Sequence, residues 1–453
     1  MIGSRHGRGG LVGGIFLVIL GVLFLVHGFR PEFNAARLLF HWWPLLLIFW
    51  GVARLLENMS ARRTGQTPGP VITGGEIFLI FLVVAACGAI VAVEKYGPDI
   101  QMGNNDEMPF GQHAEVTEEL PAKALKPGAE ILIQAQRGDI TVTGTDALEL
   151  RVVAKKTGFA MDENTAQARA HAATIRLVET SHGFEVRPEI SSSGGEHTRT
   201  NLDIQVPKQS VITVKTENGD VHVCDIAGNV FASTARGTLE VCNSGADVHA
   251  EVKHGDARIL TVKGNVRLTG SGSEVEISDV TGDASMEGEF YGPIRARNVV
   301  KGVNFVSTHT NLAVGALPGK MEMDSGDLSM DDASGNIQLT TRDKNVTMEN
   351  ITGRLRIEDK RGEVTVRLRQ APKEDISIST ESGAVDLALP SSSAFEMDAA
   401  SRSGEIENAF DDADLKVTDD AHGNAALHGK RATKGPRVEL HTTYGPIRLR
   451  KSD

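Results

Sequence analysis

Apolar and polar positions alternate in short runs through the middle of the chain, and these runs recur with a fixed period. Residues 219–290 divide into eight consecutive nine-residue units without an insertion. Each unit opens with Gly or another small residue, usually followed by Asp or Asn, and then alternates apolar with polar positions, as Val221 and Val223 do in the first unit. The pattern predicts a turn followed by a short strand with one buried face. Its repetition predicts a β-solenoid or β-roll.

The period has a second level. The eighth position is apolar in alternate units, at Ile226, Val262 and Val280, although Ser244 breaks the pattern. We therefore expect a coil of about eighteen residues, with two strands and two turns, in which residues eighteen apart lie one above the other. The outward column expected from this register contains His222, Glu240, Arg258 and Glu276. Opposite charges on neighbouring strands help to set register, at a few tenths of a kcal/mol to about 1 kcal/mol each.

The regions on either side of the repeats also favour strands. Residues 129–218 are predicted to form a β-rich entry region with one short helix at about 162–179, which Asp162 caps. The repeats and a C-terminal cap are assigned to 219–453. Within that range the period slips after Phe290 and returns at Gly326. The closing residues 438–450 are expected to form a strand pair or cap, since an open solenoid end exposes unpaired backbone.

Residues 1–97 have a different character and are predicted to form a transmembrane module. Three apolar segments, at about 11–29, 38–56 and 77–93, have lengths suited to membrane-spanning helices. Trp42, Trp43 and Pro44 stand where an interfacial belt is expected. Residues 98–128 are polar and rich in turn residues, and they are expected to form a linker.

Lys and Arg in the short flanks predict the orientation of this module. Their modest bias places the N-terminus in the cytoplasm and the β-domain in the periplasm or outside the cell, with the anchor in a bacterial inner or cytoplasmic membrane. A cleaved signal peptide is the competing interpretation of the first segment. It is disfavoured because no small-residue cleavage site follows Val26 and two more apolar segments come directly behind.

Glycines recur along the first apolar segment. Gly14, Gly21 and Gly28 are spaced by seven residues, and Gly10 with Gly14 adds a GxxxG pair. Small residues at this spacing allow helices to approach closely in lipid. Ordinary tolerance of glycine in a membrane span explains the pattern equally well.

Charge is distributed unevenly along the 453 residues. Eight of the 47 basic and four of the 59 acidic residues precede residue 98, which leaves 39 basic and 55 acidic residues after it. Nucleic-acid binding requires clustered Lys and Arg against the phosphates. The acidic β-region is therefore excluded as a nucleic-acid-binding domain.

The chain has three cysteines, and two of them are related by the repeat. Cys224 and Cys242 occupy the sixth position of alternate units, one predicted coil apart. Neighbouring strands lie about 4.8 Å apart, which is within reach of a disulfide, and an oxidising compartment would allow the bond. A disulfide and two free thiols both remain open. Cys87, in the third apolar segment, is expected to be a small apolar filler.

No motif for a catalytic site, a cofactor site or a metal site stands out. Gly-Asp pairs suggest a calcium-binding β-roll, but those repeats need several oxygen ligands per ion, whereas one acidic residue per turn is usual here. We expect each Asp to cap its own turn instead. His222, His249 and His254 fall on different columns, which favours solvated surface histidines over metal ligands. Sugar-cleaving β-helix enzymes remain the enzymatic alternative, although all three Trp lie in the membrane module.

Two parts of the chain resemble known families. The first fifty or so residues, with GGLVGGIFLVILGVLFLVHGF and then LLFHWWPLLLIFWGVARLLE, resemble the paired transmembrane module of LiaF- and LiaI-type envelope proteins. The features that carry this resemblance are Trp43-Pro44, the aliphatic run after it and Gly51. It implies association with a sensor kinase or another membrane protein.

The region from about Ala114 to the C-terminus resembles the adhesin-like "toastrack" β-repeat domains. The resemblance rests on Gly138-Asp139, the helix after the third strand, the DIQVP sequence ending at Pro207 and the run from Thr216 to Val221. It implies a β-solenoid or β-roll exported to the cell envelope, and it implies no reaction.

These observations favour a non-catalytic envelope protein without cofactors, whose exported solenoid binds a partner or surface and regulates envelope-stress signalling. An adhesin or envelope scaffold is the alternative, and a polysaccharide-acting enzyme is the weakest of the three. The expected partners are the lipid bilayer, a sensor kinase or other membrane protein, wall or surface polymer, and further copies of the chain.

Overall fold

The computed structural model describes residues 112–453, except 191–196, 421–422, 433 and 453. Strands dominate this part of the chain, and its one α-helix is α4 (Glu163–Ala172). The three apolar segments predicted to cross the membrane lie outside the described residues. Within the described part, no helix is both long enough and apolar enough to span a membrane. The mainly β architecture with one short helix agrees with the sequence prediction.

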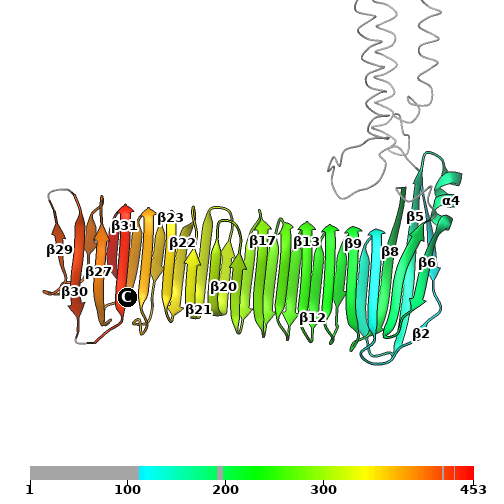
Figure 1. The fold of residues 1–453 in the computed structure, drawn as a ribbon, viewed down its shortest axis with the longest axis horizontal. Helices are drawn as coiled ribbons and strands as arrows, with labels where there is room; N and C mark the ends of the chain where they lie inside the picture. Colours follow the sequence, from blue (N-terminus) through cyan, green and yellow to red (C-terminus); the bar gives the residue numbers. More distant parts are fainter. Residues whose placement is uncertain (1–111, 191–196, 421–422, 433, 453) are drawn as a thin grey trace, which may run out of the picture. The chain divides into compact units, whose positions relative to one another are not determined.

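The centre of the domain is a ladder of two-strand coils (Figure 1). Its strands are β9 (Val211–Asn218), β10 (Val221–Cys224), β11 (Val230–Arg236), β12 (Leu239–Ser244), β13 (Val248–His254), β14 (Ala257–Val262), β15 (Val266–Gly272), β16 (Val275–Val280), β17 (Asp283–Phe290), β18 (Ile294–Val299) and β19 (Gly302–Val306). From β9 to β17, each strand pairs in parallel with the strand two further along. The even-numbered strands therefore form one face of the ladder, the even face, and the odd-numbered strands form the other, the odd face.

The register of the ladder confirms the predicted coil of eighteen residues. Val221 lies opposite Leu239, Leu239 opposite Ala257, and Ala257 opposite Val275. The outward column predicted from the sequence also follows the pairing: His222, Glu240, Arg258 and Glu276 stand in register on the even face. The repeat in the sequence is therefore the repeat of the hydrogen-bonded coil.

One apolar core runs between the two faces. The inward positions of successive coils are fully buried, as at Val223 and Val241 (each 1 % exposed) and at Ile259 and Ile277 (each 0 %). Burying such a side chain contributes roughly 1.5–3 kcal/mol. Side chains along a strand point alternately to its two sides. The residues between those that fill the core therefore point outward.

The break in the sequence period corresponds to a reversal of the chain. β20 (Asn311–Met323) runs antiparallel to β19 and then to β18, so it retraces one whole coil backwards. β21 (Asp327–Thr340) then runs antiparallel to β20 and restores the original direction. Regular parallel coils resume with β22 (Asn345–Thr352), β23 (Leu355–Arg361), β24 (Val364–Arg367), β25 (Ile376–Ser382) and β26 (Val385–Pro390).

The N-terminal end departs from the sequence prediction in two ways. Its strands are β1 (Gln112–Glu119), β2 (Lys123–Ala124), β3 (Glu130–Arg137), β4 (Ile140–Thr145), β5 (Glu149–Ala160), β6 (Ala173–Glu179), β7 (Gly183–Ile190) and β8 (Thr198–Pro207). β1 lies within the predicted linker. The predicted helix begins correctly, since Asp162 Oδ1 accepts the backbone N–H of Thr165 at 2.9 Å, but it ends at Ala172. Residues 173–179 form β6 instead, because they pair with the antiparallel strand β7.

At each end of the ladder, a coil is inserted between coils distant in sequence. β3 lies between β7 and β9, and β4 lies between β8 and β10. At the other end are β27 (Phe395–Ser401), β28 (Ile406–Asn408), β29 (Lys416–Asp419), β30 (Ala425–Arg431), β31 (Arg437–Tyr444) and β32 (Ile447–Ser452). The predicted closing strand pair is β31 and β32, but it does not cap the ladder. It is inserted between β25/β26 and β27/β28, and β29 and β30 extend beyond it.

Candidate functional site

The Gly-Asp turns connect one coil to the next through hydrogen bonds. Asp220 Oδ1 accepts the backbone N–H of Thr238 at 2.7 Å, and Asp256 Oδ1 accepts that of Glu274 at 3.0 Å. On other turns Asp247 Oδ1 accepts the N–H of Asn265 at 2.8 Å. Each of these bonds spans eighteen residues. The expectation that each Asp caps its own turn is therefore wrong, because the stacked coils bring a backbone N–H of the next coil within closer reach.

A second row of Asp and Asn side chains follows the ends of the even strands. Sequence analysis did not predict it. A residue near or just after the end of β10, β12 and β16 has a left-handed backbone, with φ of 63° at Asp225, 53° at Asn243 and 58° at Asp279. Asn243 Nδ2 donates to Asp225 Oδ1 at 3.1 Å. Asn and Asp tolerate this conformation better than most residues, so they mark the bend that leads the chain to the odd face. The available signal was the frequent Asp or Asn at the seventh position of alternate units.

These bonds bear on the calcium interpretation of the Gly-Asp pairs. The carboxylates of Asp220, Asp247 and Asp256 already accept backbone N–H groups. Calcium takes six to eight oxygen ligands in proteins, most often carboxylate and carbonyl oxygens. The acidic turns thus have a structural role in which the carboxylate holds adjacent coils together.

The even face brings two cysteines, a histidine and a glutamate together at β10 and β12. Cys224 and Cys242 are direct partners in the register, their Cα atoms are 4.6 Å apart, and the structure joins them in a disulfide. His222 lies two residues before Cys224 on the same outward side, and its Nε2 is 3.2 Å from the Cys224 sulfur. On the other side of the ring, His222 Nδ1 is 3.5 Å from Glu240 Oε2. We call these four residues the Cys-His cluster.

The other two histidines lie on the odd strand β13. His249 stacks on Phe231 of β11, with ring centroids 5.0 Å apart and an interplanar angle of 19°. His254 lies opposite Arg236 at the end of the same strands. His222, on the even strand β10, is thus separated from both, as predicted. The proximity of His222 to the cysteine pair was not predicted from the sequence.

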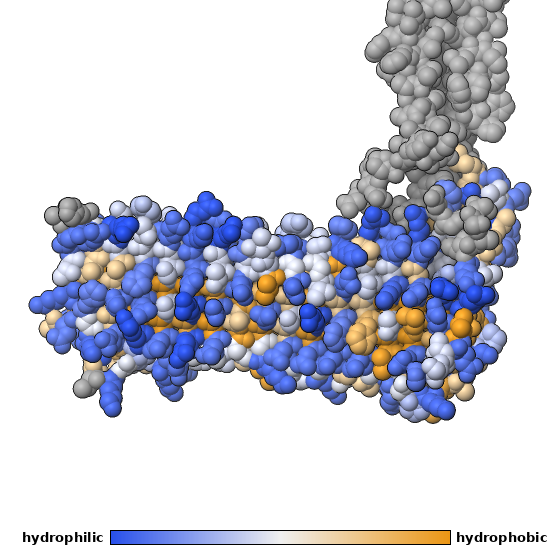
Figure 2. All heavy atoms as spheres, viewed as in Figure 1, coloured by the Kyte–Doolittle hydropathy of each residue, from blue (hydrophilic) through white to orange (hydrophobic). Residues whose placement is uncertain are grey.

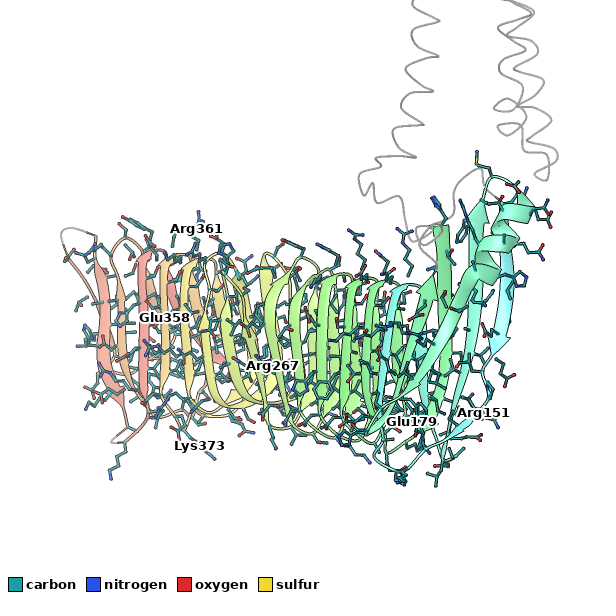
Figure 3. The ribbon with its side chains drawn as sticks, turned by 45° about the vertical axis from the view of Figure 1, so that its right-hand side comes forward. Arg151, Glu179, Arg267, Glu358, Arg361 and Lys373 are labelled. Carbon is teal, nitrogen blue, oxygen red and sulfur yellow. A yellow bond between two sulfur atoms is a disulfide. The ribbon has the colours of Figure 1, made fainter. Side chains whose placement is uncertain are left out.

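The outward surfaces of both faces are rich in ion pairs between neighbouring coils. Examples are Arg297 with Glu276 at 3.6 Å, Arg367 with Glu349 at 3.2 Å and Arg361 with Asp343 at 2.6 Å. Such exposed pairs contribute about 0–1 kcal/mol each. On the side shown in Figure 2 hydrophilic side chains cover most of the described surface, with hydrophobic strips between them. Figure 3 shows charged side chains such as Arg267 and Glu358 along the ladder.

Two buried charged groups lie in the second part of the ladder. Lys344 is 8 % exposed and its Nζ donates to the backbone carbonyl of Asp324, while Asp359 is 6 % exposed and its Oδ1 accepts the N–H of Lys360 at 2.8 Å. Burial lowers the pKa of Lys344, against the opposing charge of Asp324. Burial also raises the pKa of Asp359, and its Oδ2 has no hydrogen-bond partner. Burial therefore disfavours the charged form of both groups in the folded protein.

The remaining residues singled out from the sequence lie outside the described residues. They are the glycines and interfacial residues of the first hundred positions: Gly10, Gly14, Gly21, Gly28, Trp42, Trp43 and Pro44. Cys87 lies outside them as well. Helix packing through the glycines and interfacial placement of the aromatic residues therefore stay predictions.

Stacked parallel coils around one apolar core define the described domain as a β-repeat solenoid. The family model named Toastrack DUF4097 matches residues 128–450, and the chain belongs to this family. A second family model, the LiaF transmembrane domain, matches residues 12–96. That match continues through the third apolar segment, beyond the two segments on which the predicted resemblance rested. It indicates a membrane-anchored protein with a C-terminal toastrack domain.

Solved structures provide a further comparison. A candidate cell adhesion protein from Clostridium sporogenes is 10 % identical, with a TM-score of 0.16, and the match covers 74 % of this chain and 100 % of that one. A candidate adhesin from Bacteroides fragilis is also 10 % identical, with a TM-score of 0.19 and coverage of 75 % and 97 %. No curated protein matches the chain.

Proposed function

We propose that the protein is a non-catalytic component of the cell envelope whose solenoid, held outside the cytoplasm, is a rigid binding platform for envelope-stress regulation. The observation that carries this proposal is the regular register of the coils from β9 to β19. Because these coils pair through their strands, and several also bond through turn carboxylates, outward side chains keep fixed spacings over many coils. The LiaF-type membrane match on the same chain supports a regulatory role.

The odd face offers a contact surface for a partner. Phe231 is 38 % exposed although it is a large apolar side chain, and it stacks on His249. Arg267 follows His249 in the register of the next coil. Aromatic residues and arginine are enriched at the energetic centres of protein interfaces. We assign this row to the contact with a membrane partner of the sensor-kinase type.

A genetic test addresses the regulatory function. Deleting the gene in the native bacterium should change the output of an envelope-stress reporter, and the full chain should restore it. A Phe231→Ser, His249→Ser double variant should fail to restore it while reaching the membrane in equal amount. A matched Arg258→Ser variant on the even face should restore it fully. Reporter output that is the same with and without the gene would contradict the proposal.

A second candidate function, an adhesin or scaffold that associates with itself, has one observation in its favour. β29 is a terminal strand whose four residues are all exposed, including Val417 at 36 %. Among the described strands it pairs with β30 alone. An unpaired edge is a template for adding another strand, which would join solenoids end to end.

The size of the intact protein in mild detergent distinguishes the two candidates. A scaffold joined through β29 should sediment as a concentration-dependent oligomer, and Val417→Pro should return it to the monomer. The control is Lys430→Ala on the neighbouring strand β30. A second proline variant such as Thr365→Pro is unsuitable as a control, because it would break an internal strand. A monomer at every concentration would remove the self-association candidate and leave the regulatory proposal standing.

A further inference from the structure

We propose that the Cys-His cluster is a redox-controlled metal site, a disulfide when oxidised and a thiolate-imidazole site for a zinc-like divalent cation when reduced. The proposal is independent of the envelope-stress function. Its ligands are the sulfurs of Cys224 and Cys242 and Nε2 of His222, and all three atoms lie within 4.8 Å of one another. Two thiolates and one imidazole form a donor set that suits zinc.

The ladder itself supplies the geometry. His222 and Cys224 share one side of β10 because they are two residues apart, and Cys242 is the register partner of Cys224 on β12. In a tetrahedral site with Zn–S near 2.3 Å and Zn–N near 2.0 Å, the ligand atoms lie about 3.5–3.8 Å apart. Three ligands fixed on two paired strands therefore approach that spacing once the sulfur–sulfur bond opens. The fourth position is left to water.

Glu240 lies beside the histidine, where its carboxylate can orient the ring as a metal ligand. Its Oε2 is 3.5 Å from His222 Nδ1, on the opposite side of the ring from the Cys224 sulfur. A carboxylate that accepts Nδ1–H fixes the tautomer in which Nε2 carries the free lone pair. Glu240 is therefore a positioning residue, and the imidazole is already directed at the sulfurs.

The surroundings are compatible with both redox states. Cys224 is 7 % exposed, whereas Cys242 and His222 are half-buried, so a small reductant or a cation can approach from the Cys242 side. On the neighbouring strands, Leu260 is the register partner of Cys242 and Thr143 is the register partner of Cys224. Neither neighbouring coil therefore places a basic side chain at these positions. The nearest basic position in the adjacent column is Arg258, opposite Glu240.

The chemistry balances with a phosphine or dithiol as the reductant. A phosphine takes up the oxygen of one water molecule, the sulfur–sulfur bond breaks, and two thiols and one phosphine oxide are formed. Binding of the divalent cation then displaces the two thiol protons, because the thiolate is the metal ligand. Reoxidation by a small disulfide, which takes up the two electrons and two protons and becomes two thiols, would re-form the Cys224–Cys242 bond and release the cation.

Cobalt(II) is the probe for the test, because it gives visible bands in tetrahedral thiolate sites. The full chain carrying Cys87→Ser, in detergent, is reduced with a phosphine, desalted without oxygen and titrated with cobalt(II). We expect one cobalt per chain, with thiolate charge-transfer and tetrahedral bands, displaced by zinc. The untreated disulfide form should show none of these bands.

Variants locate the site. Cys242→Ser and His222→Gln should each abolish or shift the bands, Glu240→Gln should weaken binding by about 10–100-fold, and His249→Gln should change nothing. Circular dichroism of each reduced protein shows whether the ladder is intact. The proposal is overturned if the folded reduced protein binds no tetrahedral cobalt or if the bands persist in the Cys242 and His222 variants. Loss of the ladder on reduction would overturn it too, because the strands hold the ligands.

Discussion

Asp220 accepts the backbone N–H of Thr238 through Oδ1 at 2.7 Å, one coil further along the chain. The same kind of bond occurs at Asp247 and Asp256. Aspartate usually caps a single turn, but here its carboxylate joins the turns of two adjacent coils. In a solenoid each repeat contacts only its neighbours, and stability is close to a sum of repeat and interface contributions. Carboxylates at the turns strengthen those interfaces.

Removing the Asp220 carboxylate should weaken the ladder. We expect Asp220→Ala to lower the free energy of unfolding by about 1 kcal/mol, because the N–H of Thr238 loses its acceptor. Asp220→Asn should lose less, since its Oδ1 remains. Glu251→Ala, which removes an exposed carboxylate on a strand, is the matched control and should change stability by less than about 0.5 kcal/mol. Chemical unfolding followed by circular dichroism measures all three, and equal losses for Asp220→Ala and the control would contradict the interpretation.

The turn glycine Gly237 should be intolerant of a side chain. Its φ is 134°, and a Cβ there would lie 2.3 Å from the carbonyl oxygen of Gly219 in the coil below. Gly237→Ala must therefore both strain the backbone and push two coils apart, and we expect a loss above about 2 kcal/mol. Gly326→Ala is the control, because its nearest neighbour would be 3.9 Å away and its φ lies outside the strained range. Similar unfolding midpoints for the two variants would refute the close-approach argument.

Asp359 predicts a pH-dependent effect on stability. Burial raises the pKa of this carboxyl above its ordinary value of 3.8, so the folded state binds the proton more tightly than the unfolded state. Ionisation therefore costs stability as pH rises from 3.8 through the raised pKa, and the cost is absent below 3.8. Asp359→Asn should raise the free energy of unfolding by about 1 kcal/mol at neutral pH, and the gain should vanish in acid.

Unfolding of Asp359→Asn and of the original protein across pH gives the comparison. Glu358→Gln, an exposed neighbour paired with Arg356, should show little difference at any pH. A lower stability of Asp359→Asn at neutral pH would mean that the carboxylate is stabilising, contrary to the direction of its pKa shift.

The disulfide should stabilise the oxidised protein. Because it closes a loop of eighteen residues, Cys242→Ser should lower the free energy of unfolding by about 2–4 kcal/mol in the absence of reductant. With reductant, the variant and the Cys87→Ser background should converge. Mass spectrometry of protein from native membranes checks the premise directly, since both thiols found freely alkylated would exclude the bond.

The regular part of the fold could be predicted because its period is local. Val221 and Leu239 show the alternation that buries one side of a strand, and the eighteen-residue register follows from counting. The reversal at β20 and the inserted pair β31/β32 could not be predicted in the same way. The strands that pair there share the same alternation of apolar and polar positions as the other strands. The alternation therefore does not specify which strand pairs with which, and the pairing is seen only in the structure.

The Cys-His cluster was predicted in part. The spacing of Cys224 and Cys242 marked them as stacked, and the strand pairing bears this out. The contact of His222 with Cys224 was not predicted, although a His-x-Cys sequence on a strand places both side chains on one side. Side chains two residues apart on a strand share a side, and residues eighteen apart lie on neighbouring coils. These two periods together predict that His222 lies close to both sulfurs.

Site-specific photocrosslinking in living cells tests the central claim, that the odd face is a rigid platform for a membrane partner. A photoreactive residue is placed at Phe231, and in a parallel strain at Arg258 on the even face. We predict that the Phe231 position forms a discrete crosslink to another membrane protein and that the Arg258 position does not. Crosslinks to a partner from Arg258 but not from Phe231, or from neither position, would contradict the account.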